Sequence, residues 1–185
     1  DHGEAFGEHG AAGHGFYLID PVLRVPLILR QPGALPEGLR VAAAVSLVDV
    51  TPTILALAGI PAPDDVQGLS LLPLISDPGA PRYRDRAIYS QRHHKTSATI
   101  VVHRGDHKWV FPPEHPPSVF DLATDPGENR ALVDASLLAE GERLLEDYRA
   151  SNRVALDQLK GSPPAQPTEL DEPTREKLPR LGYAE

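Results

Sequence analysis

Four short β-rich segments in the second half of the chain limit most strongly what it can fold into. They cover residues 87–90, 98–102, 107–111 and 119–122, and Arg-Gly-Asp and Pro-Pro turns interrupt them. Short connections between such segments favour antiparallel pairing, so the pattern predicts a small antiparallel sheet. Residues 137–159 then predict one long helix that packs on the sheet. Its expected apolar stripe consists of Leu138, Leu144 or Leu145, Tyr148 and Leu156.

The part before this sheet carries both strand and helix signals. Residues 23–29 form a short apolar run that ends in a Gln-Pro-Gly turn, which predicts a buried strand. Residues 50–58 have an apolar helical period, with Asp49 as the expected N-cap and Gly59 just past the end. A shorter helix is expected over residues 70–75. Together with the sheet, these elements indicate an α/β fold.

Composition excludes several classes of protein. The chain has 185 residues, of which 41% are hydrophobic and 24% charged, an ordinary globular balance. Its net charge is −8 and its basic residues do not cluster, so no nucleic-acid partner is expected. No apolar run approaches the roughly 20 residues that a membrane span needs. Because the chain has no cysteine, it has no disulfide, thiolate ligand or cysteine nucleophile.

The polar stretch at the start of the chain holds the most chemistry. Asp1 and His2 are adjacent oxygen and nitrogen donors, and Gly3 lets the loop bend so that both can face one divalent ion. Alone, such a pair is more often a solvated surface pair. The chain begins with Asp1 rather than Met, inside this motif, and we therefore expect further sequence upstream of Asp1.

Several motifs, in this order along nearly the whole chain, resemble the sulfatase family of the alkaline-phosphatase superfamily. The motifs are Asp1-His2-Gly3-Glu4, Gly7-Glu8-His9-Gly10, Arg24-Val25-Pro26-Leu27-Ile28, Asp49-Val50-Thr51-Pro52-Thr53, Gly68-Leu69-Ser70-Leu71, Asp125-Pro126-Gly127-Glu128-Asn129 and Leu181-Gly182-Tyr183. The resemblance implies that residues 1–81 are the C-terminal end of a large mixed-sheet catalytic domain. Residues 82–160 would be a small antiparallel-sheet subdomain with its helix, and residues 161–185 a Pro-rich strap and tail.

The resemblance also implies roles for single residues. Asp1 and His2 would be metal ligands, for calcium first and for manganese or magnesium as alternatives. His14 stands where the family commonly has a lysine that contacts the sulfate, so His14 is a departure whose charge would fade near neutral pH. The best candidates for substrate contacts are His93, His94 and Lys95.

Other polar residues receive structural interpretations. We interpret Glu4, Glu8 and His9 as hydrogen-bonding residues that order the loop, and Asp49 as a helix cap. Three further histidines have no ligand spacing and are expected at the surface or at a substrate cleft. They are His103, His107 and His115.

The resemblance implies hydrolysis of a small-molecule or carbohydrate sulfate ester through a covalent sulfo-enzyme intermediate. The family nucleophile is a formylglycine made from a Cys or Ser in a Cys/Ser-x-Pro-x-Arg motif, which this chain lacks, and it is expected upstream. Two alternatives stay open: a phosphonate monoester or phosphodiester hydrolase of the same superfamily, and a non-catalytic remnant or binding module.

The isolated chain is expected to be inactive and to expose apolar side chains around residues 25–29 and 50–58. Poor solubility or oligomerisation of the isolated chain would follow from that exposure. The sequence leaves the compartment and the native oligomeric state open.

Overall fold

A computed structural model describes residues 2–14, 17–94, 97–160 and 172. The chain separates into two compact units, residues 1–151 and 152–185. All elements described below belong to the first unit, except residues 152–160 of the last helix. The subdomain boundaries expected after residues 81 and 160 stay predictions.

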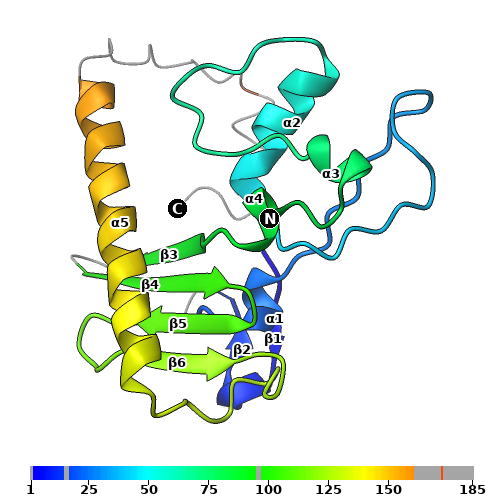
Figure 1. Ribbon diagram of the computed structural model, residues 1–185. Coiled ribbons are helices and arrows are strands. Elements are labelled where there is room, and N and C mark those ends of the chain that lie inside the picture. The colour runs from blue at the N-terminus through cyan, green and yellow to red at the C-terminus, as the bar shows by residue number, and fades with distance from the viewer. Residues whose placement is uncertain (1, 15–16, 95–96, 161–171, 173–185) are drawn as a thin grey trace. The chain divides into compact units, whose positions relative to one another are not determined.

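A four-stranded antiparallel sheet lies in the lower part of the view in Figure 1, with α5 across it. Its strands are β3 (Ile88–His94), β4 (Ser97–Arg104), β5 (His107–Phe111) and β6 (Ser118–Asp121), in the order β3-β4-β5-β6. This confirms the predicted sheet. The first two strands are longer than the apolar pattern suggested, because their pairing runs on through polar residues from Ile88↔His103 to His94↔Ser97.

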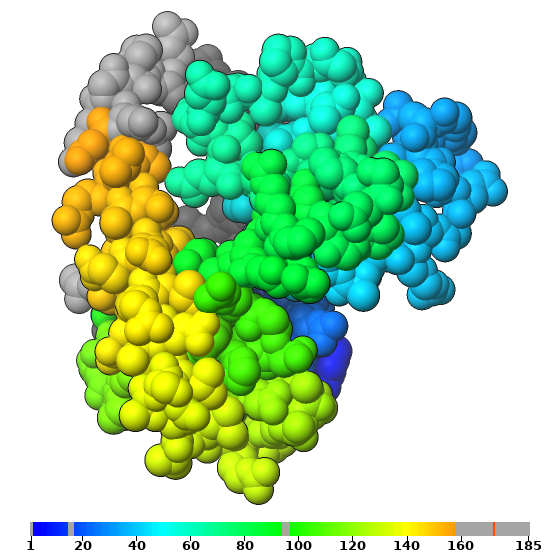
Figure 2. Space-filling view, in the orientation of Figure 1, coloured from blue at the N-terminus to red at the C-terminus, as the bar shows by residue number. Residues whose placement is uncertain are grey.

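One face of the sheet packs on helix α5 (Ala135–Lys160). In Figure 2 the yellow part of this helix covers the green strands. Trp109 lies at the centre of the shared core and donates its Nε1–H to the carbonyl of Leu137 at 2.8 Å. The core also contains Ile100, Val102, Val119 and Leu145.

The predicted helix and most of its stripe are confirmed, but the placement of Leu156 in the stripe is wrong, since Leu156 is 58% exposed. The helical part of the sheet core reaches only as far as Tyr148, two turns before Leu156.

Because side chains alternate along a strand, neighbours of the core residues point to the other face of the sheet, which carries both apolar and charged side chains. Trp109 points into the core with α5, so its neighbour Lys108 points to the opposite face. His103, which pairs with Lys108 in the β4–β5 register, points to that face as well. Lys108 is fully buried on that face. This face meets α1 (Asp20–Leu23), which Figure 1 shows beside the edge where β4 ends and β5 begins.

Residues 47–84 contribute short helices that a buried carboxylate ties to the sheet. They are the 3₁₀ turn η2 (Leu47–Asp49), α2 (Val50–Leu57), α3 (Pro73–Ser76) and α4 (Pro81–Arg84). The Asp49 carboxylate accepts the N–H groups of Ser46 and Leu69, both at 2.8 Å, and pairs with Arg86, two residues before β3.

The helix predicted over residues 50–58 is confirmed, and Gly59 follows it with φ +70°. Asp49 acts differently from the predicted N-cap. It is the acidic residue of a capping box that opens at Ser46, one turn earlier. The short helix begins at Pro73 rather than at residue 70, since proline suits the first helical turn.

The strand predicted over residues 23–29 is wrong. Leu23 ends α1, and residues 24–31 have no regular structure. Ile28 is 86% exposed there, and Ile54 on α2 is 56% exposed, which confirms the predicted exposure of apolar side chains in these two segments. A strand needs a neighbour to accept its hydrogen bonds, and among the described residues no strand pairs with this run. None of the helices in the described part of the chain is long and apolar enough to cross a membrane.

Candidate metal-binding loop and its buried support

The candidate metal-binding loop, residues 2–14, folds back on itself as a tight hairpin. Strands β1 (Ala5–Phe6) and β2 (Ala12–Gly13) pair in the register Ala5↔Gly13, and the 3₁₀ turn η1 (Glu8–Gly10) connects them. The connection needs left-handed backbone at His9, with φ 53°, and at the flanking glycines. This register places Glu4 opposite His14.

A hydrogen bond to the backbone fixes the tautomer of His2. Its Nδ1 lies 2.8 Å from the carbonyl oxygen of Gly3. A carbonyl can only accept, so Nδ1 carries the hydrogen and the lone pair of the neutral ring lies on Nε2. Metal-binding histidines commonly donate their second ring N–H in this way. His2 therefore fits a divalent ion.

The rest of the predicted ligand set cannot be placed from these residues. Asp1 lies outside the described residues. Within the described part of the chain, no group of three or more His, Asp or Glu side chains could hold a metal ion by itself. The described loop therefore supplies one predicted ligand, His2.

The hairpin brings His14 next to His2. The two ring centroids are 4.1 Å apart and the rings are tilted by 30°. The Nδ1 of His14 lies 3.2 and 3.3 Å from the two carboxylate oxygens of Glu4, to which it donates. The residue in the place of the family lysine thus lies beside the predicted ligand, and a carboxylate orients it.

The remaining polar residues of the loop order its backbone. The Glu8 carboxylate accepts the N–H of Phe6 at 2.6 Å, which confirms its interpretation as a loop-ordering residue. Hydrogen bonds from the backbone N–H groups of Glu8 and Phe6 lower the pKa of the Glu8 carboxyl. Glu4 has the partner His14, which the sequence did not indicate.

Helix α1 packs directly against the loop. The N–H of Gly3 donates to the carbonyl of Val22 at 2.8 Å. A Cβ atom at Gly3 would lie 2.0 Å from the carbonyl oxygen of Pro21, so only glycine fits this close approach. A small apolar cluster of Ala5, Ala11, Ile19 and Val22 joins the hairpin to the same helix.

A buried ion cluster in turn holds α1 against the sheet. Asp20 Oδ1 lies 3.1 Å from Lys108 Nζ and 3.0 Å from His103 Nε2. Lys108 Nζ also contacts Glu128 Oε2 at 2.6 Å, and Glu128 Oε1 accepts the backbone N–H of Asp20 at 2.8 Å. We call Asp20, His103, Lys108 and Glu128 the ion cluster.

Lys108 and His103 keep the buried Asp20 carboxyl in its ionised form. Burial alone would raise the pKa of the Asp20 carboxyl. The hydrogen bond from His103 and the charge of Lys108 outweigh that effect and lower the pKa to about 2. Asp20 is therefore ionised at every physiological pH.

A rigid turn presents Glu128 to the ion cluster. The turn uses hydrogen bonds from Asp125 N–H to the Asp121 carbonyl at 2.8 Å and from Glu128 N–H to the Asp125 carbonyl at 3.0 Å. The Asp125 carboxylate accepts the N–H of Arg130 at 2.8 Å. Glu128 itself has φ 54°, a left-handed conformation that points its side chain inward.

Sequence reasoning missed the ion cluster. His103 was expected at the surface or at a substrate cleft, and that prediction is wrong, because its side chain is only 18% exposed and bonds Asp20. A lysine next to Trp109 inside a predicted strand was the available signal. Strand alternation places it on the face opposite Trp109, but nothing in the sequence indicated its partners 88 and 20 residues away.

Two of the three predicted substrate contacts, His93 and His94, belong to strand β3. His93 is exposed in β3, and its Nε2 contacts the side-chain amide of Gln91 in the same strand. His94 ends β3, and its side chain, like the whole of Lys95, lies outside the described residues. Their role stays a prediction.

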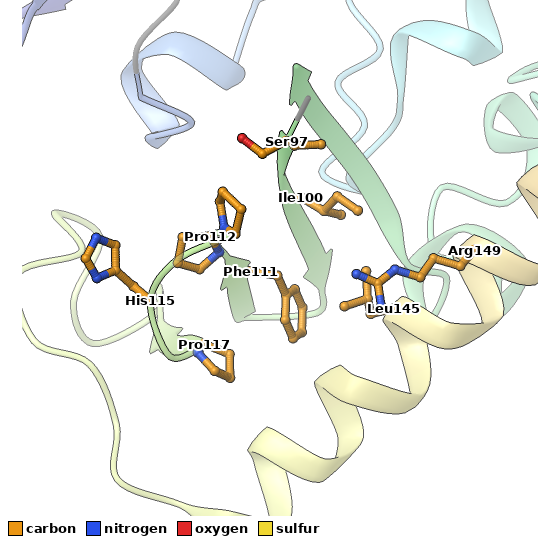
Figure 3. A pocket seen from close by; sticks show the side chains of 10 residues that line it. Ser97, Ile100, Phe111, Pro112, His115, Pro117, Leu145 and Arg149 are labelled. Atoms are coloured by element: carbon orange, nitrogen blue, oxygen red, sulfur yellow. The ribbon is translucent and has the colours of Figure 1, made fainter. Parts of the chain in front are cut away.

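A separate open cavity of about 570 Å³ lies between the sheet and α5 (Figure 3). Ile100, Phe111 and Leu145 form its apolar side, and Arg149 reaches over them from α5. His115 lies at the opposite rim, in the Pro-rich turn between β5 and β6. None of the residues that line it belongs to the candidate metal-binding loop.

The chain is similar in sequence to known sulfatases. Residues 7–151 match a family model described as the C-terminal part of N-sulphoglucosamine sulphohydrolase. Human arylsulfatase K is 33% identical over 141 residues, which cover 69% of this chain and 25% of that protein. The chain thus spans about a quarter of the length of this relative.

Two solved structures share the fold. A phosphonate monoester hydrolase of Agrobacterium radiobacter superposes with a TM-score of 0.65 at 24% identity, over 83% of this chain and 34% of that one. A protein in complex with its substrate D-glucosamine-2-N,6-O-disulfate gives a TM-score of 0.64 at 24% identity, over 84% of this chain and 33% of that one. These similarities confirm the α/β fold class.

Proposed function

This chain belongs to the sulfatase family as its C-terminal portion, and we propose that it supplies part of the active site of a metal-dependent hydrolase of sulfate esters. The observation that carries the proposal is the pairing of His2 and His14, with ring centroids 4.1 Å apart, on one hairpin. The nucleophile, a formylglycine, would come from a segment upstream of Asp1.

Asp1 and His2 would hold the metal ion. His2 would bind through Nε2, since Nδ1 donates to the Gly3 carbonyl. The bound ion, calcium first and manganese or magnesium as alternatives, would offset negative charge on the sulfate oxygens. The loop residues keep their places through the hairpin and through α1.

His14 would contact the sulfate in place of the family lysine. In the imidazolium form both ring nitrogens donate, so Nδ1 can stay on Glu4 while Nε2 donates to a sulfate oxygen. Glu4 would fix the direction of the ring. This gives the carboxylate a role that a lysine at position 14 would not need.

We propose a sulfated carbohydrate as the substrate. A protein of the same fold has been solved with a disulfated glucosamine. His93, His94 and Lys95 would contribute contacts to the sugar. A phosphonate monoester hydrolase is the second candidate, because a protein with that activity has a comparable fold similarity and the same kind of metal site could serve both esters.

The test is an assay of the full-length protein against two matched substrates, an aryl sulfate and an aryl phosphonate monoester, followed by sulfated glucosamines. We expect sulfate release that stops with a chelator and returns with calcium or manganese. Faster turnover of the phosphonate would establish the second candidate instead. Hydrolysis of neither ester would favour a non-catalytic module.

A further inference from the structure

Helix α1 is too short to hold its own position. It has four residues, a single turn, and isolated helices of that length are not stable in water. Asp20 joins it to the sheet and to the turn after β6: the side chain bonds Lys108 and His103, and the backbone N–H donates to Glu128. On the other side, Ile19 and Val22 pack against the loop. The helix therefore connects the sheet and the loop.

Two steps connect Asp20 to the predicted metal ligand. Val22, two residues after Asp20, accepts the N–H of Gly3 at 2.8 Å. Gly3 lies so close to α1 that a Cβ atom would be 2.0 Å from the Pro21 carbonyl oxygen, and its own carbonyl accepts Nδ1–H of His2. A shift of α1 would thus carry Gly3, and with it the orientation of the His2 ring.

We propose that Asp20 is a positioning residue for the metal site, and that the ion cluster transmits the position of the C-terminal sheet to His2 through α1 and Gly3. The proposal rests on the metal site proposed above. It assigns a functional use to Lys108, His103 and Glu128, whose side chains make no hydrogen bond or ion pair with the described residues of the loop. Asp49 provides the contrast: it is also buried and paired with a cation, but it bonds Ser46, Leu69 and Arg86 rather than a residue of α1.

The experiment measures metal affinity rather than turnover. Calcium and manganese are titrated calorimetrically into the metal-free full-length protein and its Asp20→Asn variant. We expect Asp20→Asn to weaken binding about 10-fold, since outer partners of a metal ligand typically contribute 10–100-fold to affinity. Asp49→Asn is the matched control, which should lower the melting temperature of the metal-free protein but leave the dissociation constant unchanged.

A second pair of variants separates the loss of a hydrogen bond to Asp20 from a general defect in folding. His103→Gln keeps an N–H donor toward Asp20 and should retain most of the affinity, whereas His103→Leu removes the donor and should weaken binding several-fold. If Asp20→Asn and His103→Leu melt cooperatively and bind both ions as tightly as the wild type, the proposal is wrong. A loss of affinity in Asp49→Asn as large as in Asp20→Asn would also contradict it, because any destabilisation would then suffice.

The proposed function can fail separately. If the wild-type protein binds neither ion saturably, the metal site itself is refuted, and the positioning role with it. If the wild type binds the ions and Asp20→Asn binds them with the same affinity, the metal site stands and the positioning role alone is refuted.

Discussion

The four-stranded sheet with α5 and the candidate metal-binding loop use their side chains in opposite ways. The sheet buries its large residues, with Trp109 at 1% exposure and Val119 at 0%. The loop leaves Phe6 86% exposed and keeps its shape by glycine turns and backbone hydrogen bonds. The sheet therefore accounts for stability, the loop carries the proposed metal ligand His2, and the ion cluster holds α1, which connects the two.

The largest effect should follow loss of the buried cation. Lys108→Met leaves the Asp20 and Glu128 carboxylates buried beside each other without a compensating charge. We expect the free energy of unfolding to fall by about 3–5 kcal/mol, as when one partner of a buried ion pair is removed. Urea denaturation measures it. A loss below 1 kcal/mol would mean that the cluster contributes little to holding the sheet and α1 together.

The next largest effect concerns the loss of stability at acidic pH. The Asp20 carboxyl has a pKa of about 2 in the folded chain against an ordinary value of 3.8. A lowered pKa stabilises the fold above the unfolded value, and that stabilisation, about 2 kcal/mol, disappears as the pH falls from about 4 to 2. Denaturation at a series of pH values should show a shallower acid dependence in Asp20→Asn. Parallel curves for both proteins would contradict the lowered pKa.

A smaller effect should come from the contact between α5 and the sheet. A Cβ atom at Gly141 would lie 2.2 Å from Cδ1 of Trp109. In Gly141→Ala, overpacking costs about 1–3 kcal/mol and the gain in helix propensity returns about 1 kcal/mol. We expect a net destabilisation of about 1 kcal/mol by thermal melting. A stabilised variant would show that the helix is free to move away from Trp109.

The smallest effect on stability is expected in the loop. His14 is half exposed and its bond to Glu4 lies at the surface, so His14→Ala should change the free energy of unfolding by less than about 0.5 kcal/mol. Its effect on sulfate-ester turnover should be large by comparison. His14→Lys, which restores the family residue, should keep most of the turnover that His14→Ala loses. Turnover of His14→Ala equal to that of the wild type would exclude a contact between His14 and the sulfate.

The parts of the fold that were predicted correctly are those with local patterns. The four strands and α5 follow from alternation and helical period within each segment. The strand predicted over residues 23–29 was wrong because an apolar run does not reveal whether another strand is present to pair with it. Ile28 in that run is exposed instead.

The candidate site likewise has residues that local motifs indicated and residues that only the folded chain brings together. His2 and His14 were found from the order of motifs, and their 4.1 Å contact follows from the hairpin. The bond between Asp20 and Lys108 joins residues 88 positions apart, and no local pattern encodes such a pair. Glu128 entered the sequence analysis only as part of a motif that resembles the family. Its inward direction depends on a left-handed φ, which the sequence did not indicate.

The most direct test of the account measures kcat/KM for sulfate-ester hydrolysis in the full-length protein and in its His2→Ala variant, at saturating calcium or manganese. His115→Ala, at the rim of the separate cavity, is the control histidine. We predict a loss of about 100-fold or more in His2→Ala with an unchanged melting temperature of the metal-free protein, and wild-type turnover in His115→Ala. Equal turnover in His2→Ala and the wild type would contradict the assignment of this loop to the active site.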